Sequence, residues 1–342
     1  MDIWKHDYEE LIFLQNRSIG FKAIIAIHNT KLGPALGGCR MKRYASEADA
    51  VCDAIRLAQG MTYKSAISGI PYGGGKAVIL EQPGQGTREQ LFRELGRELQ
   101  KLNGLYITGL DLGSTVQDMN FVKEETSYVT DVTGSLGAVN DLTATMTAYG
   151  VYLGIKASLK QTTGSESLQN RVVAVQGLGK VGYRLCRYLH ADGAKLIVAD
   201  IDPGRNLLAE KEFNAAICAA DDLLYVPCDV LAPCALGGIL DDAAVAKLDC
   251  SIIAGAANNQ LAEERIGEKL HRRGIRYAPD YVINAGGIIV TAAELEGADA
   301  AKAKRDVERI YSNLQHVYAE AEKHGLSAAA AANEITRELL RK

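Results

Sequence analysis

The hydrophobic pattern of the first third of the chain predicts both strands and helices. Residues 21–28 form an apolar run that is typical of a buried strand, and this strand ends at Asn29. Ser46 and Asp49 form a helix-capping signal, with Asp49 in the place that Glu or Gln usually occupies, so we expect a helix to begin here. Its buried face would carry the apolar residues Val51, Ile55 and Ala58.

A second helix is predicted beyond a glycine-rich segment. Residues 69–76 hold so much glycine that we expect no regular element there. The second helix follows because leucines recur at spacings of four, four and three, which places them on one helix face. These residues are Leu91, Leu95, Leu99 and Leu102.

The pattern changes after residues 148–170, which we interpret as a helix followed by a polar loop. Short continuous apolar runs then alternate with helical stretches, and runs of this kind are typical of parallel strands that are covered on both faces. The runs are 172–175, 196–199, 230–232 and 251–254. This alternation predicts a doubly wound parallel sheet from about residue 145 onward. Two helical stretches end the chain; the first breaks at Gly325 and the second begins at Ser327.

These patterns together predict an α/β protein with two domains. A chain of 342 residues exceeds what one hydrophobic core usually organises. We assign residues 1–140 to an N-terminal α/β domain and residues 141–322 to a Rossmann-type doubly wound domain, with a cleft between the two. Residues 323–342 would form a C-terminal helix that packs back on the first domain.

Composition and charge narrow the class of protein. Apolar residues make up 47% of the chain and charged residues 23%, which is ordinary for a globular enzyme. The formal charge of −4 argues against a nucleic-acid or anionic-membrane partner, since both need clustered Lys and Arg. The N-terminus does not resemble a signal peptide and no apolar run could span a bilayer, so we expect a cytoplasmic protein. The seven cysteines lack metal-ligand spacing, and we expect buried, reduced thiols and no metal.

A glycine loop at residues 177–182 predicts a dinucleotide site. It follows the apolar run 172–175, opens a helix, and reads Gly177-Leu178-Gly179-Lys180-Val181-Gly182. Gly177 would permit a tight turn, Gly179 a close approach of the backbone to a pyrophosphate, and Gly182 close packing of helix and strand. The N–H groups at the start of the helix would meet the phosphate charge.

Asp200 predicts which dinucleotide binds. It ends the next strand, 18 positions after Gly182. An acidic side chain in this place accepts hydrogen bonds from the ribose hydroxyls and repels a 2′-phosphate, so NAD is favoured over NADP. Arg205, five positions further along, is the neighbouring residue that could weaken this preference.

Two lysines and an aspartate in the first half are candidates for the chemistry. Lys76 stands between three glycines and the apolar residues 77–80, so we expect little access to water. Burial disfavours the ammonium form, as a general base requires. Asp111 is flanked by glycine and apolar residues and could partner such a lysine. Lys64 is the second candidate lysine, and for each lysine alone a solvated surface side chain is the alternative.

These motifs resemble those of the Glu/Leu/Phe/Val amino-acid dehydrogenase family, most closely its leucine dehydrogenase branch, along nearly the whole chain. The matching stretches are 32–38 (LGPALGG), 60–64 (GMTYK), 73–76 (GGGK), Asp111, 232–237 (APCALG), 254–261 (AGAANNQL) and 279–287 (PDYVINAGG). The resemblance implies reversible oxidative deamination of an L-amino acid to a 2-oxo acid and ammonia, with NAD as the cofactor. It also implies that the first domain binds substrate, carries out catalysis and mediates oligomerisation. We expect a homo-oligomer, without assuming the octamer common in the family, because the chain stops earlier than many relatives.

The resemblance further implies roles for individual residues. Lys64 would bind the substrate α-carboxylate, Lys76 would activate the water that attacks the imino carbon, and Asp111 would shuttle protons. Asn258 would help to hold the substrate. The remaining cofactor contacts, in addition to the glycine loop and Asp200, are expected from Ile201, Cys234, Ala235, Ala256 and Asn284, and from Thr147 and Asn259, which would hold the nicotinamide carboxamide.

The resemblance places Leu36, Gly37, Gly109, Ile288 and Thr291 around the substrate. The leucine-preferring pattern has Ala in place of Gly109 and Val in place of Thr291. Glycine at 109 would enlarge the pocket, as in the phenylalanine-preferring branch, whereas Ile288 takes some volume back. A methyl group changes discrimination by only about 1–3 kcal/mol. Leucine, valine and isoleucine are therefore favoured, with phenylalanine or tryptophan as the alternative; glutamate would need a cation that this pocket lacks.

Two other classes of protein are weaker alternatives. A non-catalytic NAD-binding protein would be expected to lose the catalytic side chains, yet Lys64, Lys76 and Asp111 are all present. A hydroxy-acid dehydrogenase would need a catalytic histidine, and none of the six histidines lies in a comparable cluster.

Residues 140–146 depart from the family pattern, because they lack its proline and contain one additional residue close to the domain junction and to Thr147.

Overall fold

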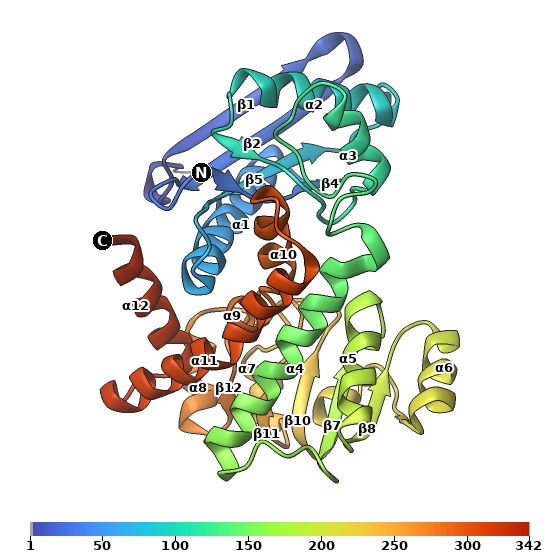
Figure 1. The fold of residues 1–342 in the computed structure, drawn as a ribbon, viewed down its shortest axis with the longest axis vertical. Helices are drawn as coiled ribbons and strands as arrows, with labels where there is room; N and C mark the ends of the chain where they lie inside the picture. The colour runs from blue at the N-terminus through green and yellow to red at the C-terminus, as the bar shows by residue number, and fades with distance from the viewer. Residues whose placement is uncertain (1–2, 342) are drawn as a thin grey trace. The chain divides into compact units, whose positions relative to one another are not determined.

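Contacts between residues divide the chain into two compact units in the computed structural model, which describes residues 3–341. The first unit contains the described residues up to Asp141 together with Thr291–Ala300, and the second contains Leu142–Val290 and the described residues from Ala301 onward. The boundary after Asp141 lies close to the one predicted near residue 140, whereas the return of Thr291–Ala300 to the first unit was not predicted. Figure 1 shows the course of the chain through both units.

The first unit is built on a mixed sheet in which the order of strands is β1-β2-β5-β3-β6, with β4 also beside β5. β1, β2 and β5 are antiparallel neighbours, whereas β3 and β4 run parallel to β5, and β6 runs parallel to β3. The strands are β1 (Glu10–Asn16), β2 (Phe21–Asn29), β3 (Ala35–Leu36), β4 (Cys39–Lys42), β5 (Gly73–Leu80) and β6 (Tyr106–Ile107). The predicted strand ending at Asn29 is therefore confirmed as β2.

Helices cover both faces of this sheet (Figure 1). They are α1 (Glu47–Ser68), α2 (Arg88–Lys101) and α3 (Val116–Lys123), together with the 3₁₀ turns η1 (Ile3–Lys5), η2 (Arg17–Ile19) and η3 (Val139–Asp141). Ser46 caps α1 by accepting a hydrogen bond from Asp49 N, which confirms the predicted start of this helix. Ala77 and Ile79 of β5 pack in the core under α2 and α3, and Val78 and Leu80 pack under α1.

The glycine run 73–75 begins the central strand β5, so the prediction that residues 69–76 form no regular element is wrong. Neighbouring groups approach this strand so closely that side chains would not fit. A Cβ on Gly73 would lie 2.0 Å from Asn29 O, one on Gly74 would lie 2.0 Å from Thr62 N, and one on Gly75 would lie 2.8 Å from the Tyr106 ring. These glycines therefore reflect close packing within a sheet and not a flexible loop.

The second unit contains a parallel sheet in the order β12-β11-β10-β7-β8-β9. Its strands are β7 (Val172–Gln176), β8 (Lys195–Ala199), β9 (Ala216–Ile217), β10 (Cys228–Pro233), β11 (Cys250–Ile253) and β12 (Arg276–Tyr277). Counted from β7, this is the order 3-2-1-4-5-6 of a dinucleotide-binding Rossmann sheet, and the chain reverses direction across the sheet between β7 and β10. The predicted α/β fold with a doubly wound parallel sheet is confirmed.

The helices of the second unit follow its strands, as a doubly wound sheet requires. They are α4 (Leu142–Thr163), α5 (Lys180–Ala191), α6 (Pro203–Phe213), α7 (Asp242–Lys247), α8 (Arg265–Arg272), α9 (Asp280–Ile283), α11 (Ala300–His324) and α12 (Ala328–Arg341), with the turn η4 (Leu223–Tyr225). α10 (Gly286–Leu295) begins in this unit, and its residues from Thr291 onward belong to the first unit. α12 packs against α8 and β12 within this unit. This differs from the expectation that the last helix packs on the first domain.

The segment 140–146 begins α4, which starts six residues before the helix that we predicted. Asn140 and Asp141 precede it in the left-handed region, with φ values of 56° and 53°.

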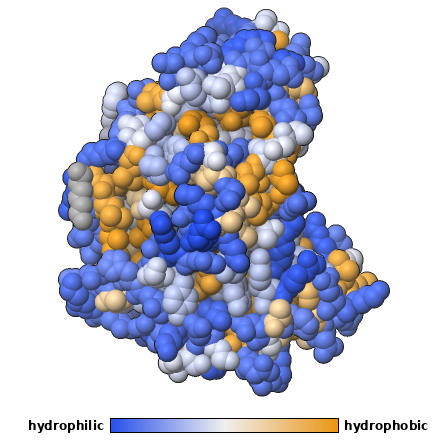
Figure 2. Space-filling model, in the orientation of Figure 1, coloured by the Kyte–Doolittle hydropathy of each residue, from blue (hydrophilic) through white to orange (hydrophobic). Residues whose placement is uncertain are grey.

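Within residues 3–341, no helix is both long and apolar enough to cross a membrane. All seven cysteines are free thiols, but Cys52 is exposed and only Cys39 and Cys186 are fully buried. Most of the surface visible in Figure 2 is hydrophilic, with separate apolar patches.

The tight packing of α1 on β5 predicts opposite effects for two glycine substitutions. Gly74→Ala should destabilise the protein by about 3 kcal/mol, because its methyl group would overlap Thr62 N. Gly60→Ala is the matched control inside α1, where nothing lies within 4 Å of the added Cβ. It should stabilise the helix by about 0.5–1 kcal/mol. Urea unfolding followed by circular dichroism measures both changes, and equal effects would contradict the close approach.

Candidate active site

Lys76 lies on the central strand β5 and is almost fully buried. Only 4% of Lys76 is exposed, and its backbone pairs with Ala26 of β2. Because side chains alternate along a strand, Lys76 lies on the same face as Val78 and Leu80, under α1. Its Nζ lies 3.2 Å from Asp111 Oδ2. The structure therefore brings the two predicted catalytic residues into contact.

Asp111 lies in the loop that follows β6, and its backbone is held in place. Its N–H donates a hydrogen bond to Ser114 Oγ at 2.9 Å, and the Ser114 hydroxyl donates one to Asp111 O. Burial acts to raise the pKa of the Asp111 carboxyl, but the charges of Lys76 and Arg40 outweigh it and lower that pKa. The carboxylate is therefore ionised at neutral pH, as a partner for a cation should be.

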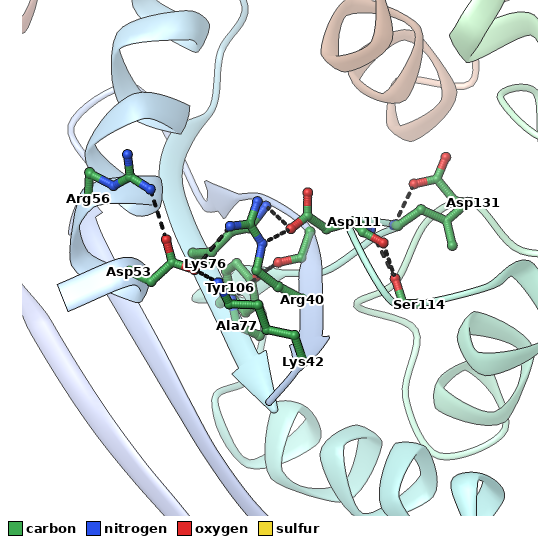
Figure 3. Close-up of polar contacts among 12 residues, drawn as sticks. Arg40, Lys42, Asp53, Arg56, Lys76, Ala77, Tyr106, Asp111, Ser114 and Asp131 are labelled. Atoms are coloured by element: carbon green, nitrogen blue, oxygen red, sulfur yellow. Dashed lines mark hydrogen bonds and ion pairs between the residues drawn. The ribbon is translucent and has the colours of Figure 1, made fainter. Parts of the chain in front are cut away.

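A third charged residue that sequence reasoning missed contacts the same carboxylate (Figure 3). Arg40 of β4 donates from Nε to Asp111 Oδ2 at 2.8 Å. Its Nη1 donates to Asp53 Oδ2 of α1 at 3.0 Å. Tyr44 and Arg56 hold the Asp53 carboxylate further, at 2.7 and 3.0 Å. The available signal was an arginine between Cys39 and Met41 in a short strand that is otherwise apolar at buried positions.

The predicted substrate contacts Lys64, Leu36 and Gly37 lie around the same strand. Lys64 is partly buried on α1, the helix that packs on β5. Leu36 is 2% exposed on β3. A Cβ on Gly37 would lie 1.9 Å from Gly75 O, so glycine is needed for the close approach of the two segments. The three residues thus belong to segments of the first unit that pack on or pair with β5.

The predicted pocket residue Gly109 contacts a segment that sequence reasoning did not consider. Leu110 N donates to Asp131 Oδ2 at 2.9 Å, and Thr130 N donates to Thr108 O at 2.8 Å. A Cβ on Gly109 would lie 2.6 Å from both Asp131 Oδ2 and Thr130 Oγ1. These side chains already fill the space that the glycine leaves. The predicted enlargement of the substrate pocket at Gly109 therefore depends on where these two side chains lie.

Asp131 is a buried carboxyl beside the loop that carries Asp111. It is 8% exposed, and burial, together with the charge of Glu294, raises its pKa despite the hydrogen bond from Leu110 N. Its φ of 58° lies in the left-handed region. Because Asp131 accepts the N–H of Leu110, it ties residues 108–111 to the neighbouring segment 129–131.

In the second unit, the glycine loop has the local geometry that its motif predicts. Gly177 has a φ of 92°, and a Cβ there would lie 2.7 Å from Ala235 Cβ. A Cβ on Gly182 would lie 1.9 Å from Gly177 O, so the loop and the first turn of α5 touch. Around Gly179, by contrast, nothing lies within 4 Å of a built Cβ, and no side chain caps α5. Leu178 is buried, and Lys180 and Val181 form the first turn of α5.

Asp200 follows β8 and is tied to the glycine loop. Leu178 N donates to its Oδ2 at 2.6 Å, and Asp202 N donates to its Oδ1 at 2.9 Å. Burial acts to raise the pKa of Asp200, but these N–H groups and Arg205 lower it. Arg205 lies 3.5 Å from Asp200 and 3.4 Å from Asp202, so its charge is paired with two carboxylates. Ile201 is 93% exposed beside this site.

Asn284 carries a buried polar atom that has no partner among the described residues. Its Nδ2 donates to Ala256 O at 3.0 Å and to Asn258 Oδ1 at 2.8 Å, whereas its buried Oδ1 accepts no hydrogen bond. Asn259 has a φ of 53°, and its N–H donates to Asp280 Oδ2. Asn258, Asn259 and Asn284, which were predicted to touch substrate or cofactor, thus lie close together. The side-chain oxygen of Asn284 is available to accept a hydrogen bond.

The other predicted cofactor and substrate contacts lie after β10, where the order of strands reverses, and along α4 and α10. Cys234 N donates to Gln176 O at 2.7 Å, which places Cys234 and Ala235 beside the glycine loop. The Thr147 hydroxyl donates to Thr143 O at 2.8 Å and lies close to Gly287. Ile288 is buried in the second unit, whereas Thr291, on the same helix, belongs to the first.

The two units carry features that are typical of a dehydrogenase. The first holds a buried lysine paired with a partly buried carboxylate, and the second has the sheet order and glycine loop of a dinucleotide-binding domain. In a dehydrogenase the nucleotide unit binds the redox cofactor, and the other unit can supply acid–base groups.

Comparisons with known proteins agree with this class. Residues 13–128 match the family model of the Glu/Leu/Phe/Val dehydrogenase dimerisation domain. Residues 137–215 and 204–340 match the Glutamate/Leucine/Phenylalanine/Valine dehydrogenase model. The chain therefore belongs to the Glu/Leu/Phe/Val dehydrogenase family, whose members are pyridine-nucleotide-dependent amino-acid dehydrogenases.

Three relatives show how evenly the similarity is spread over the chain. The leucine dehydrogenase of Thermoactinomyces intermedius is 50% identical over 98% of this chain and 91% of its own. The phenylalanine dehydrogenase of Caldalkalibacillus thermarum is 42% identical over 98% of this chain and 92% of its own. The crystal structure of the L-tryptophan dehydrogenase from Nostoc punctiforme is 40% identical, with a TM-score of 0.86 over 99% of this chain and 97% of its own.

The contact between Gly109 and Asp131 predicts that substitutions at the two positions are coupled. Gly109→Ala should lower kcat/KM about tenfold or more, because the methyl group displaces Asp131 and with it the loop that carries Asp111. In an Asp131→Gly background, where glycine also suits the left-handed φ, the same change should cost clearly less. Steady-state kinetics of the four proteins measure the coupling, and additive losses would refute the contact.

Proposed function

We propose that this protein catalyses the reversible NAD-dependent oxidative deamination of an aliphatic L-amino acid, with leucine, valine and isoleucine preferred. The product would be the corresponding 2-oxo acid, with ammonia. The observation that carries this proposal is the contact of Lys76 Nζ with Asp111 Oδ2 on a buried strand, under the helix that bears Lys64. The higher identity to a leucine dehydrogenase than to a phenylalanine or tryptophan dehydrogenase supports the choice of substrate.

The side chains of the first unit can perform the acid–base steps of this reaction. Lys64 would pair with the substrate α-carboxylate and so fix the position of the substrate Cα. Bound NAD would accept the hydride that leaves Cα. Lys76, in its neutral form, would then take a proton from the water that attacks the imino carbon, because a neutral amine beside a cationic imine avoids like-charge repulsion. Asp111 would hold the proton next to Lys76 until ammonia leaves.

The second unit fits NAD in three respects. The open space beside Gly179 and the uncapped start of α5 leave room and N–H groups for a pyrophosphate. The unpartnered Asn284 Oδ1 offers an acceptor for an amide N–H, such as that of a carboxamide. Asp200 keeps negative charge next to the loop, and Arg205 is paired with Asp200 and Asp202, which disfavours a 2′-phosphate.

The substrate pocket supports a branched aliphatic side chain over a larger one. Thr130 and Asp131 take up the space at Gly109 that would otherwise favour phenylalanine or tryptophan. Leu36 in the first unit is apolar and buried, and so is Ile288 in the second. Thr291 is also buried and is polar, so the aromatic substrates stay as the second candidates in the test. We also propose a homo-oligomer in the cytoplasm; the dimerisation-domain model that matches residues 13–128 supports association.

A panel of L-amino acids with NAD tests this function. We expect NADH formation with a kcat/KM that is highest for leucine, valine or isoleucine, and about tenfold or more lower for phenylalanine and tryptophan. Lys76→Ala should abolish turnover while NADH still binds, as measured by fluorescence titration. Lys22→Ala is the control, because Lys22 pairs with Glu47 at the surface of the same unit. A kcat/KM for phenylalanine far above that for leucine would overturn the substrate assignment, and full activity of Lys76→Ala would overturn the mechanism.

Asp200 predicts the discrimination between NAD and NADP. Asp200→Asn removes the charge that repels a 2′-phosphate and releases Arg205. The ratio of kcat/KM for NAD to that for NADP should therefore fall about tenfold or more. Asp202→Asn, which also frees one contact of Arg205, is the matched control and should change the ratio less. An unchanged ratio in Asp200→Asn would show that another residue excludes NADP.

A further inference from the structure

The carboxylate beside Lys76 is shared between two cations, and this sharing is unexplained by the proposed reaction. Arg40 Nε and Lys76 Nζ contact the same oxygen, Asp111 Oδ2, at 2.8 and 3.2 Å. A lysine that must lose a proton is poorly served by an unshielded carboxylate, because the negative charge favours the ammonium form. The guanidinium is always charged and therefore offsets that carboxylate permanently.

Arg40 is itself held from the opposite side. Asp53 of α1 accepts from Arg40 Nη1 at 3.0 Å, and its side chain is only 10% exposed. Tyr44 OH donates a hydrogen bond to Asp53 Oδ2 at 2.7 Å, and Arg56 Nη2 lies 3.0 Å from Asp53 Oδ1. These two contacts hold the Asp53 carboxylate in place. Burial acts to raise the pKa of Asp53, but Tyr44, Arg56 and Arg40 lower it, so Asp53 is ionised. Arg40 is therefore clamped between two carboxylates on different elements, as Figure 3 shows.

The strands explain why these side chains meet. β4 runs parallel to β5, with Arg40 opposite Val78, and Cys39 N donates to Gly109 O just before Asp111. Arg40 and Lys76 thus come from adjacent strands on the face that α1 covers, whereas Cys39 and Ala77 lie on the opposite face. The charges run in alternation from the buried strand to the surface: Lys76, Asp111, Arg40, Asp53 and Arg56.

We propose that Arg40 is a positioning residue of the reaction, which holds Asp111 in place and balances its charge so that Lys76 can act as a base, and that Asp53 sets how strongly Arg40 does so. This inference rests on the proposed function, in which Lys76 accepts a proton. Arg40 touches neither substrate nor cofactor in this scheme; it acts through Asp111.

Other titratable groups around Lys76 do not replace this role. Burial raises the pKa of the Cys39 thiol and of the Tyr106 hydroxyl, so both are uncharged at neutral pH. Burial lowers the pKa of His28, which faces Thr62 on α1. Lys42 and Tyr44 lie beside Asp53, and Asp131 accepts from Leu110 N. The other charged or titratable residues of α1 are Glu47, Asp49, Cys52, Arg56, Tyr63 and Lys64, and β2 also carries Lys22.

The test compares the pH dependence of kcat/KM for L-leucine in wild type, Arg40→Gln, Arg40→Lys and Asp53→Asn. Without the guanidinium, the Asp111 charge acts on Lys76 alone, so Lys76 keeps its proton to higher pH. The acid limb of the Arg40→Gln profile should therefore move up by about one pH unit or more. Arg40→Lys retains the charge and should restore most of the wild-type profile. Asp53→Asn leaves Arg40 less neutralised, so its acid limb should move to lower pH.

A second measurement keeps the proposal testable without turnover. Trace acetylation of Lys76, followed by mass spectrometry across the same pH range, reports the fraction of the amine that is unprotonated. The profiles of the four proteins should shift in the same directions as the kinetic ones. If wild type oxidises no L-amino acid, the proposed function fails, whereas the acetylation profiles still test Arg40.

Three results would overturn the role of Arg40. One is an Arg40→Gln profile that coincides with wild type in both measurements. Another is a shift of Arg40→Gln and Asp53→Asn in the same direction, which would indicate loosened structure and not charge balance. The third is an Arg40→Lys profile displaced as far as that of Arg40→Gln. Circular dichroism of each variant confirms folding, and Asp53→Asn tests the same balance if Arg40→Gln does not fold.

Discussion

The close approach of α1 to β5 is the constraint on which the rest of the first unit depends. At Gly74 the helix backbone lies where a side chain would begin, so the helix and the strand are separated by no more than their own main chains. This contact places the only charged side chain of β5, Lys76, under a helix and away from water. A buried charged side chain is costly unless it is paired, and the loop after β6 supplies the partner carboxylate, Asp111.

The pairing extends in a chain because one carboxylate is not enough. Transfer of an ion pair from water to a protein interior often costs more than the pair returns, and additional hydrogen bonds must make up the difference. Asp111 gains these from Arg40, and Arg40 gains them from Asp53. The chain ends at Arg56, whose side chain is 59% exposed, so the last charge is solvated directly. Alternation of sign from Lys76 to the surface thus offsets the cost of burying a lysine on β5.

Much of this organisation could be predicted from the sequence because it depends on local patterns. The apolar runs of β7, β8, β10 and β11 and the glycine loop required no knowledge of distant contacts, and the doubly wound sheet followed from them. The pairing of Lys76 with Asp111 was anticipated from their neighbours in the chain. The glycines of β5 misled the sequence analysis because the same residue type serves flexible loops and crowded strands. Which of the two applies depends on Thr62 and Tyr106, which lie far away in sequence.

The prediction at Gly109 depends in the same way on residues that are distant in sequence. A missing methyl group enlarges a pocket only if nothing else moves into the space, and here Thr130 and Asp131 occupy it. If specificity is inferred from residue 109 alone, space that Thr130 and Asp131 occupy is counted as space for the substrate. Relatives should therefore be compared at residues 109 and 131 together. Because Asp131 also accepts the N–H of Leu110, a change in this pair reaches Asp111 as directly as it reaches the substrate. In the proposed function, substrate preference and the placement of Asp111 are thus coupled through one short loop.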